Sequence, residues 1–213
     1  NCTRKAIEKS QLAERLGADG LLVVTPYYNK CTQNGLVAYY KAICEAVSIP
    51  VIAYNVPGRT GVEIQPATMA KIAEIPNIAG IKDAGGNMSK TMETFRLVRE
   101  KCDVYSGEDA LNLPILACGG VGVISVLSNV LPAEVKKLCT LVAEGKMQDA
   151  IALNDSLLPV ANACFCEVNP IPVKAAMAAL GYCENFVRGP LVPMEGEPYE
   201  KMLSVMREYG LNV

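Results

Sequence analysis

Short apolar runs rich in Val and Ile recur along the first two thirds of the chain, and each run ends in glycine or polar residues. They predict five strands, at residues 20–24, 51–54, 78–82, 103–106 and 122–126. The segments between them carry apolar residues at helical spacing. They predict helices at residues 3–16, 35–47, 65–75, 89–101, 110–117 and 133–143.

This alternation of strands and helices predicts an α/β fold with a parallel sheet, because the strands are apolar throughout and would be covered by helices on their faces. Periodicity alone leaves open a closed barrel or an open doubly wound sheet. In both folds, ligands bind beyond the carboxyl ends of the strands.

The rhythm changes at about residue 144, after which no further strand is predicted. Helical patterns cover residues 147–165, 172–180 and 199–209. We therefore expect two parts, an α/β part over residues 1–143 and a helical part over residues 144–213.

Charge and hydropathy exclude several classes of function. The net charge is −2 and no stripe of Lys or Arg is present, so nucleic acid is not an expected partner. No run approaches the roughly 20 apolar residues of a membrane span. The nine cysteines are odd in number and irregularly spaced, and they predict reduced core residues of a cytoplasmic protein.

The chain contains no histidine, which limits the chemistry available to it. Ser–His and Cys–His nucleophile systems are excluded, and a general acid or base must be Tyr, Lys, Asp, Glu or Cys. Cys164 and Cys166 form a CxC pair without a second pair at metal-ligand spacing, so neither a zinc site nor any other metal or cofactor is predicted.

Polar side chains gather where the predicted strands end. In chain order they include Thr25, Tyr27, Tyr28, Tyr54, Asn55, Arg59, Lys82, Asp83, Ser106, Gly107, Glu108, Asp109, Ser125, Ser128 and Asn129. Because the carboxyl ends of parallel strands lie at one edge of the sheet, we expect an amine, a phenol and a guanidinium to meet there.

Lys82, Tyr54 and Arg59 together suggest Schiff-base chemistry on a keto acid. A lysine attacks a carbonyl only when neutral, and roughly one in a few thousand is neutral at pH 7 when the pKa is about 10.4. Burial at a strand end raises that fraction, a phenol can move protons, and an arginine can pair a carboxylate. The alternatives are a Lys82 that reaches solvent or pairs with Asp83, a core tyrosine, and a loop salt bridge at Arg59.

Several motifs then resemble the dihydrodipicolinate synthase family, which belongs with N-acetylneuraminate lyase to the class I pyruvate aldolases. The resemblance rests on Tyr54–Gly61 (YNVPGRTG) and Gly80–Asp83 (GIKD), supported by VTPYYN at 24–29, GVIS at 122–125 and NPIPVK at 169–174. It covers essentially the whole chain. A phosphate-binding barrel is a weaker alternative, because Gly85-Gly86 and Gly119-Gly120 do not match a phosphate loop.

The resemblance implies a (β/α)8 TIM barrel with a C-terminal helical domain, and it implies a role for each of six site residues. Lys82 would form the Schiff base with pyruvate, Tyr54 would relay protons, and Tyr28 would reach into the site of a neighbouring subunit. Arg59 would hold the carboxylate of the second substrate, while Gly107 and Ile124 would line the pyruvate pocket.

The implied reaction condenses pyruvate with L-aspartate 4-semialdehyde to 4-hydroxy-tetrahydrodipicolinate, on the route to lysine and diaminopimelate. No cofactor is implied, and the implied assembly is a tetramer built as a dimer of dimers. Arg59 favours this reaction over that of other pyruvate-dependent aldolases of the family.

Five predicted strands are fewer than the family's eight, so we expect an N-terminally truncated barrel. The preceding segment would carry a Gly-Thr-Thr-Gly-Glu motif whose threonine links the two tyrosines of the proton relay. We therefore expect this chain by itself to have little activity, and an inactive oligomeric or structural protein is the alternative.

Feedback by lysine is expected to be weak. Asn1 and Tyr27 match positions of the family's allosteric lysine site, and Lys5 stands where lysine-inhibited members tend to carry a carboxylate. A cation at that position would repel the ammonium groups of the effector.

Overall fold

The structure is a computed structural model that describes residues 1–213. The chain forms two compact units, residues 1–108 with 114–124 and residues 109–113 with 125–213. These units do not test the division predicted at residue 143, which stays a prediction.

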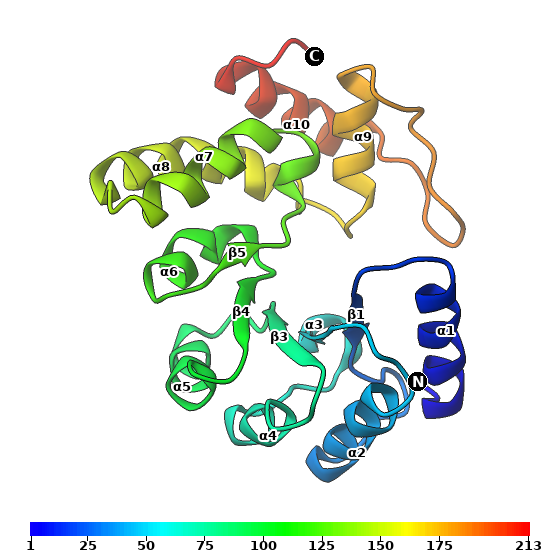
Figure 1. The fold of residues 1–213 in the computed structure, drawn as a ribbon. Helices are drawn as coiled ribbons and strands as arrows, with labels where there is room; N and C mark the ends of the chain where they lie inside the picture. The colour runs from blue at the N-terminus through cyan, green and yellow to red at the C-terminus, as the bar shows by residue number, and fades with distance from the viewer. The chain divides into compact units, whose positions relative to one another are not determined.

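The first unit is built on a parallel sheet of five strands whose order in space follows their order in the chain (Figure 1). The strands are β1 (Leu21–Val24), β2 (Val51–Asn55), β3 (Ile78–Asp83), β4 (Asp103–Ser106) and β5 (Gly122–Val123). The first four confirm the predicted strands to within a residue. Sequential order and parallel direction follow from the helix that connects each strand to the next.

The fifth strand is shorter than predicted, because residues 124–126 are not part of it. The backbone N–H groups of Val126 and Leu127 donate to Oδ2 of Asp109, at 2.8 and 2.9 Å. Amides held by a carboxylate cannot join the sheet ladder, and residues Leu127–Asn129 form the 3-10 helix η2 instead.

The helices of the first part of the chain confirm the predicted pattern with shifted ends. They are α1 (Thr3–Arg15), α2 (Gln33–Cys44), α3 (Pro57–Thr60), α4 (Pro66–Ile72), α5 (Met88–Val98), the 3-10 helix η1 (Asp109–Leu111) and α6 (Asn112–Ala117). α3 lies inside the segment predicted as a loop. The N-cap of α5 is Asn87, whose side chain accepts a hydrogen bond from the Lys90 N–H.

Helices cover one face of the sheet, and α1 packs on α2, α2 on α4, and α4 on α5. Strand residues that face the helices, such as Val51 and Ala53, are fully buried, whereas Ile52 and Tyr54 on the other face are half-buried. The helices that the pattern predicted are therefore present on the face opposite Tyr54, and the face that carries Tyr54 is the more accessible one.

The second unit is helical, as predicted for the C-terminal part of the chain. It contains α7 (Pro132–Ala143), α8 (Met147–Ala163), α9 (Ile171–Ala179) and α10 (Gly196–Tyr209). α7 and α10 both pack on α8, and α9 packs on α10. Their shared core includes Leu138, Leu157, Val160, Met202 and Met206, each nearly inaccessible to solvent.

The cysteines differ from the prediction in their burial. All nine are free thiols, but only Cys44 and Cys164 are buried, and Cys166 is exposed. No helix in the structure is long and apolar enough to cross a membrane.

Candidate active site

Lys82 and Tyr54 lie side by side at the carboxyl ends of β3 and β2. The two residues are partners in the parallel register, so their side chains point to the same face of the sheet. Nζ of Lys82 is 4.1 Å from the centroid of the Tyr54 ring. The predicted meeting of an amine and a phenol at one edge of the sheet is therefore present in the structure.

The environment of Tyr54 keeps its phenol protonated. Burial raises the pKa of Tyr54 above its ordinary value, and the Glu108 carboxylate raises it further, whereas the Arg59 guanidinium lowers it. The net shift is upward, so the hydroxyl is a proton donor at neutral pH. Glu108 was noted in the sequence only as a strand-end residue, and its effect on Tyr54 follows from its position after β4.

Arg59 is exposed and lies on the short helix α3, directly after β2. Pro57 begins the helix, and Gly61 ends it in the left-handed region with φ of 68°. This single turn brings the guanidinium close enough to Tyr54 to affect the pKa of its phenol. An exposed guanidinium beside a phenol and an amine suits the binding of a carboxylate from solution.

Because Gly107 has no side chain, the Lys82 side chain can pack against its backbone. A Cβ atom at Gly107 would lie 2.9 Å from both Cγ and Cε of Lys82, closer than carbon atoms approach. The Gly107 N–H donates to the carbonyl of Asp83 at 2.8 Å, and the Ile124 N–H donates to the carbonyl of Ser106 at 2.7 Å. Both predicted pocket residues thus follow neighbouring strand ends.

Tyr28 does not join these residues within one chain. Its side chain is 91% exposed, and its backbone has φ of 67°, in the left-handed region that non-glycine residues rarely adopt. This conformation follows directly from the turn after β1, where the Asn29 N–H donates to the Tyr27 carbonyl at 2.9 Å.

Asp83 does not serve as the predicted alternative partner of Lys82. Successive residues of a strand point to opposite faces, so Asp83 faces the helices while Lys82 faces the accessible side. The Asp83 carboxylate is 7% exposed and accepts hydrogen bonds from Asn55, Gly85 and Thr91. In the sequence Asn55 was recognisable only as a strand-end residue, and Thr91 carried no signal of this role.

No group of three or more His, Cys, Asp or Glu side chains lies together as a metal ion would require. A cavity of about 370 Å³ lies at the other end of the strands, between the ends of α2 and α4. Its lining is Lys41, Cys44, Glu45, Glu74, Ile75 and Pro76. Because ligands of parallel α/β folds bind at the carboxyl ends of strands, the Lys82 site is the stronger candidate.

Comparison with known proteins agrees with this geometry. The model of the dihydrodipicolinate synthetase family matches residues 1–208. The chain belongs to this family. A curated relative from Alkaliphilus oremlandii, named 4-hydroxy-tetrahydrodipicolinate synthase, is 50% identical over 211 residues, which are 99% of this chain and 73% of the relative.

Solved structures of family members have the same fold. Dihydrodipicolinate synthase from Aquifex aeolicus aligns with a TM-score of 0.97 and 43% identity, over 100% of this chain and 73% of that one. The chloride-inhibited enzyme from Acinetobacter baumannii, solved in complex with pyruvate, aligns with a TM-score of 0.95 and 43% identity. That alignment covers 98% of this chain and 72% of the other. The parallel sheet described above is thus part of a TIM-barrel fold of this family.

Proposed function

We propose that this protein is a 4-hydroxy-tetrahydrodipicolinate synthase that condenses pyruvate with L-aspartate 4-semialdehyde through a Schiff base on Lys82. The observation that carries the proposal is the position of the Lys82 amine, 4.1 Å from the ring centroid of a tyrosine whose pKa is raised. Membership of the family, and the names of relatives about half identical to this chain, support the same reaction.

The first half of the reaction uses Lys82 and Tyr54. The neutral amine attacks the keto carbon of pyruvate, and the resulting carbinolamine loses water to form an imine. The departing oxygen needs a proton, and the protonated Tyr54 phenol beside the amine can supply it. Gly107 leaves room for the lysine stem in this arrangement.

The second half forms the carbon–carbon bond. Loss of a methyl proton turns the imine into an enamine, whose carbon attacks the aldehyde carbon of the semialdehyde. The amino group of that substrate then displaces Lys82 from the imine carbon, which closes the ring and restores the free lysine. The overall reaction releases one water, and the Arg59 guanidinium, on the short helix that follows β2, would hold the substrate carboxylate.

A second copy of the chain would complete the site with Tyr28. An aromatic side chain that is 91% exposed on a left-handed backbone is suited to insertion into a neighbouring molecule. We propose a dimer in which each Tyr28 enters the partner's site, with two dimers forming a tetramer. The weak lysine feedback expected from Lys5, which is exposed on α1, stays a prediction.

Reductive trapping tests the proposal directly. Incubation with pyruvate and borohydride should convert the imine to a stable amine, and peptide mass analysis should find the label on Lys82. Lys82→Arg should remove the label, whereas the matched variant Lys174→Arg should keep it. Turnover of pyruvate after addition of L-aspartate 4-semialdehyde should be slow in this chain by itself, as expected from the sequence, and it should be confined to the wild type and Lys174→Arg. A label on Lys174 would overturn the assignment.

A further inference from the structure

A row of buried polar side chains lies one residue further along the strands than Tyr54 and Lys82. Asn55, Asp83 and Ser106 are successive partners in the register of β2, β3 and β4, and they are 5%, 7% and 0% exposed. Each follows a residue whose side chain points to the accessible face, among them Tyr54 and Lys82. Polar groups are costly to bury unless they are hydrogen-bonded, so this row needs partners.

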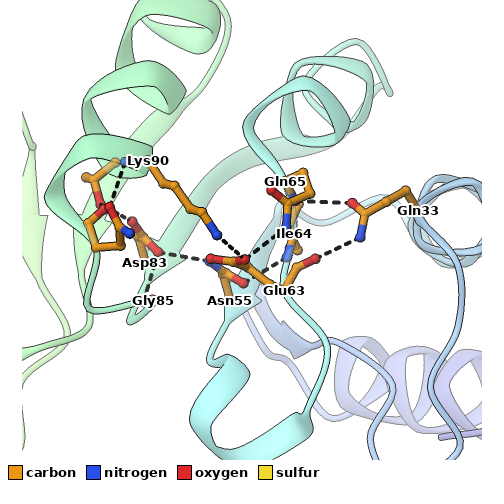
Figure 2. A network of polar contacts seen from close by, with 10 residues as sticks. Gln33, Asn55, Glu63, Ile64, Gln65, Asp83, Gly85 and Lys90 are labelled. Atoms are coloured by element: carbon orange, nitrogen blue, oxygen red, sulfur yellow. Dashed lines mark hydrogen bonds and ion pairs between the residues drawn. The ribbon is translucent and has the colours of Figure 1, made fainter.

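Asn55 and Asp83 are each other's partners across the two strands. Nδ2 of Asn55 donates to Oδ1 of Asp83 at 3.0 Å, and Oδ1 of Asn55 accepts from the Ile64 N–H at 3.0 Å (Figure 2). The Asn55 side chain therefore ties β3 to the far end of the loop that carries Arg59.

The Asp83 carboxylate is also bound to the segment that follows β3. Oδ1 accepts from the Gly85 N–H at 3.1 Å, and Oδ2 accepts from the Thr91 hydroxyl at 2.6 Å. A Cβ atom at Gly85 would lie 3.1 Å from Oδ1 of Asp83 and 3.2 Å from Nδ2 of Asn55. Glycine at this position thus leaves room for the hydrogen bond between the two side chains.

An outer set of contacts extends the same network to α2 and α5. Glu63 accepts from Lys90 at 2.5 Å, and its carbonyl accepts from Gln33 at 2.9 Å (Figure 2). These outer groups are partly exposed, so we expect them to contribute less than the buried pair. The arrangement fixes both strand ends and both following loops from the side opposite the substrate.

We propose that Asn55 and Asp83 are positioning residues that hold the Tyr54 ring and the Lys82 amine at their reactive separation. The inference rests on the proposed function, because it concerns the formation of the pyruvate imine. Neither side chain faces the substrate, since both point toward the helices. Displacement of reacting groups by about 1 Å can slow a reaction about a hundredfold, so a pair that fixes two neighbouring strand ends can affect the rate strongly.

Two substitutions at Asp83 separate positioning from charge. Asp83→Ala removes all three hydrogen bonds, and we expect the rate of borohydride-trapped imine formation and kcat to fall at least about tenfold, with the KM for pyruvate changed less than about threefold. Asp83→Asn should keep the trapping rate and kcat within about threefold of the wild-type values, because Oδ1 can still accept from Asn55 and Gly85. The Thr91 hydroxyl can accept from the new amide while it donates to the Asn87 carbonyl, 3.1 Å away.

A second pair of variants covers the case in which Asp83→Ala does not fold. Asn55→Ala removes the cross-strand hydrogen bond and the bond from the Ile64 N–H, and it should also slow imine formation. Thr91→Val removes one bond to Asp83, whereas the matched variant Thr94→Val changes another buried threonine of α5 that does not bind Asp83. We expect a slower rate in Thr91→Val than in Thr94→Val.

All variants are compared at a temperature at which circular dichroism shows them to be folded. Equal trapping rates in the folded Ala variants and the wild type would overturn the positioning role while leaving the proposed function intact. A trapping rate in Asp83→Asn as low as that in Asp83→Ala would also contradict the positioning role. Absence of any label on Lys82 in the wild type would instead overturn the proposed function.

Discussion

At the residue scale, neighbouring positions at each strand end have opposite tasks. Tyr54 and Lys82 point to the accessible face, and the next residue in each strand, Asn55 or Asp83, points to the helices. The first member of each pair can meet a substrate, and the second binds the loop that follows. Ser106 repeats the second task in β4, where its hydroxyl donates to the Glu108 carbonyl at 3.0 Å.

Gly107 provides a test of how closely the Lys82 side chain is confined. Gly107→Ala places a methyl group 2.9 Å from two carbon atoms of Lys82, and Gly107 is not among the glycines with positive φ, so the backbone itself accepts alanine. Overpacking of this kind costs about 1 to 3 kcal/mol, which corresponds to a rate about five- to 150-fold lower if the cost falls on the reactive arrangement. The measurement is the rate of imine trapping at saturating pyruvate.

Gly58→Ala is the matched control for this substitution, because a Cβ atom at Gly58 meets nothing within 4 Å. Its trapping rate should stay close to that of the wild type. A Gly107→Ala variant that traps pyruvate as fast as Gly58→Ala would contradict the steric argument.

At the element scale, two tyrosines attach α2 to the first strand. The Tyr40 hydroxyl donates to the Val23 carbonyl at 2.9 Å, while the Tyr39 hydroxyl lies 3.4 Å from the Val24 carbonyl. Tyr40 is completely buried. The helix thus supplies hydrogen-bond donors to two backbone carbonyls of β1.

Tyr40→Phe should lower the free energy of unfolding by about 1 to 2 kcal/mol at pH 8, because it leaves the Val23 carbonyl without its donor. Tyr39→Phe should lower it less, since its hydrogen bond is long. Urea unfolding followed by circular dichroism measures both values. Equal decreases in the free energy of unfolding of the two variants would show that the Tyr40 hydrogen bond stabilises the fold no more than the Tyr39 bond does.

The same tyrosines predict how stability depends on alkaline pH. Burial raises the pKa of Tyr39 to about 12 and that of Tyr40 well above its ordinary value. In the unfolded chain both titrate near pH 10, so above about pH 10 the unfolded state binds fewer protons than the native state. The stability contribution is complete below about pH 10 and is lost as pH rises. The loss between pH 9 and 11 should be smaller in Tyr40→Phe than in the wild type.

At the scale of the whole molecule, the proposed site needs residues from two chains. Tyr28 is 91% exposed, and no hydrogen bond within its own chain holds its hydroxyl. In the proposed dimer, each site would combine Lys82 and Tyr54 of one chain with Tyr28 of the other.

Mixing two inactive variants tests this arrangement. Lys82→Arg and Tyr28→Phe should each turn over slowly, but a mixed dimer contains one site with an intact Lys82 and an intact Tyr28. Random mixing should then restore about a quarter of the wild-type activity. The readout is turnover after subunit exchange, with mixed dimers verified by native mass spectrometry. Mixed dimers without recovered activity would show that Tyr28 does not act across the interface.

Several features could be predicted from the sequence because local physics determines them. Apolar runs alternating with helical patterns predicted the parallel α/β order, and Lys82 and Tyr54 were placed at strand ends because those runs stop at them. Their proximity could be predicted because parallel strands bring their carboxyl ends to one edge of the sheet, whatever the details of side-chain packing. The motifs around them were specific enough to predict the family.

Other features depend on the tertiary structure, because they arise from atoms distant in the chain. The fifth strand does not extend to Val126 because Asp109 takes the N–H groups of Val126 and Leu127, a competition that no local pattern reveals. The Asn55–Asp83 bond joins residues 28 positions apart, and its existence depends on register and on the absence of a side chain at Gly85. The sequence by itself determined which reactive groups lie at the edge of the sheet. Packing and register decided how they are held, because hydrogen bonds between strands depend on distances that the chain acquires only when folded.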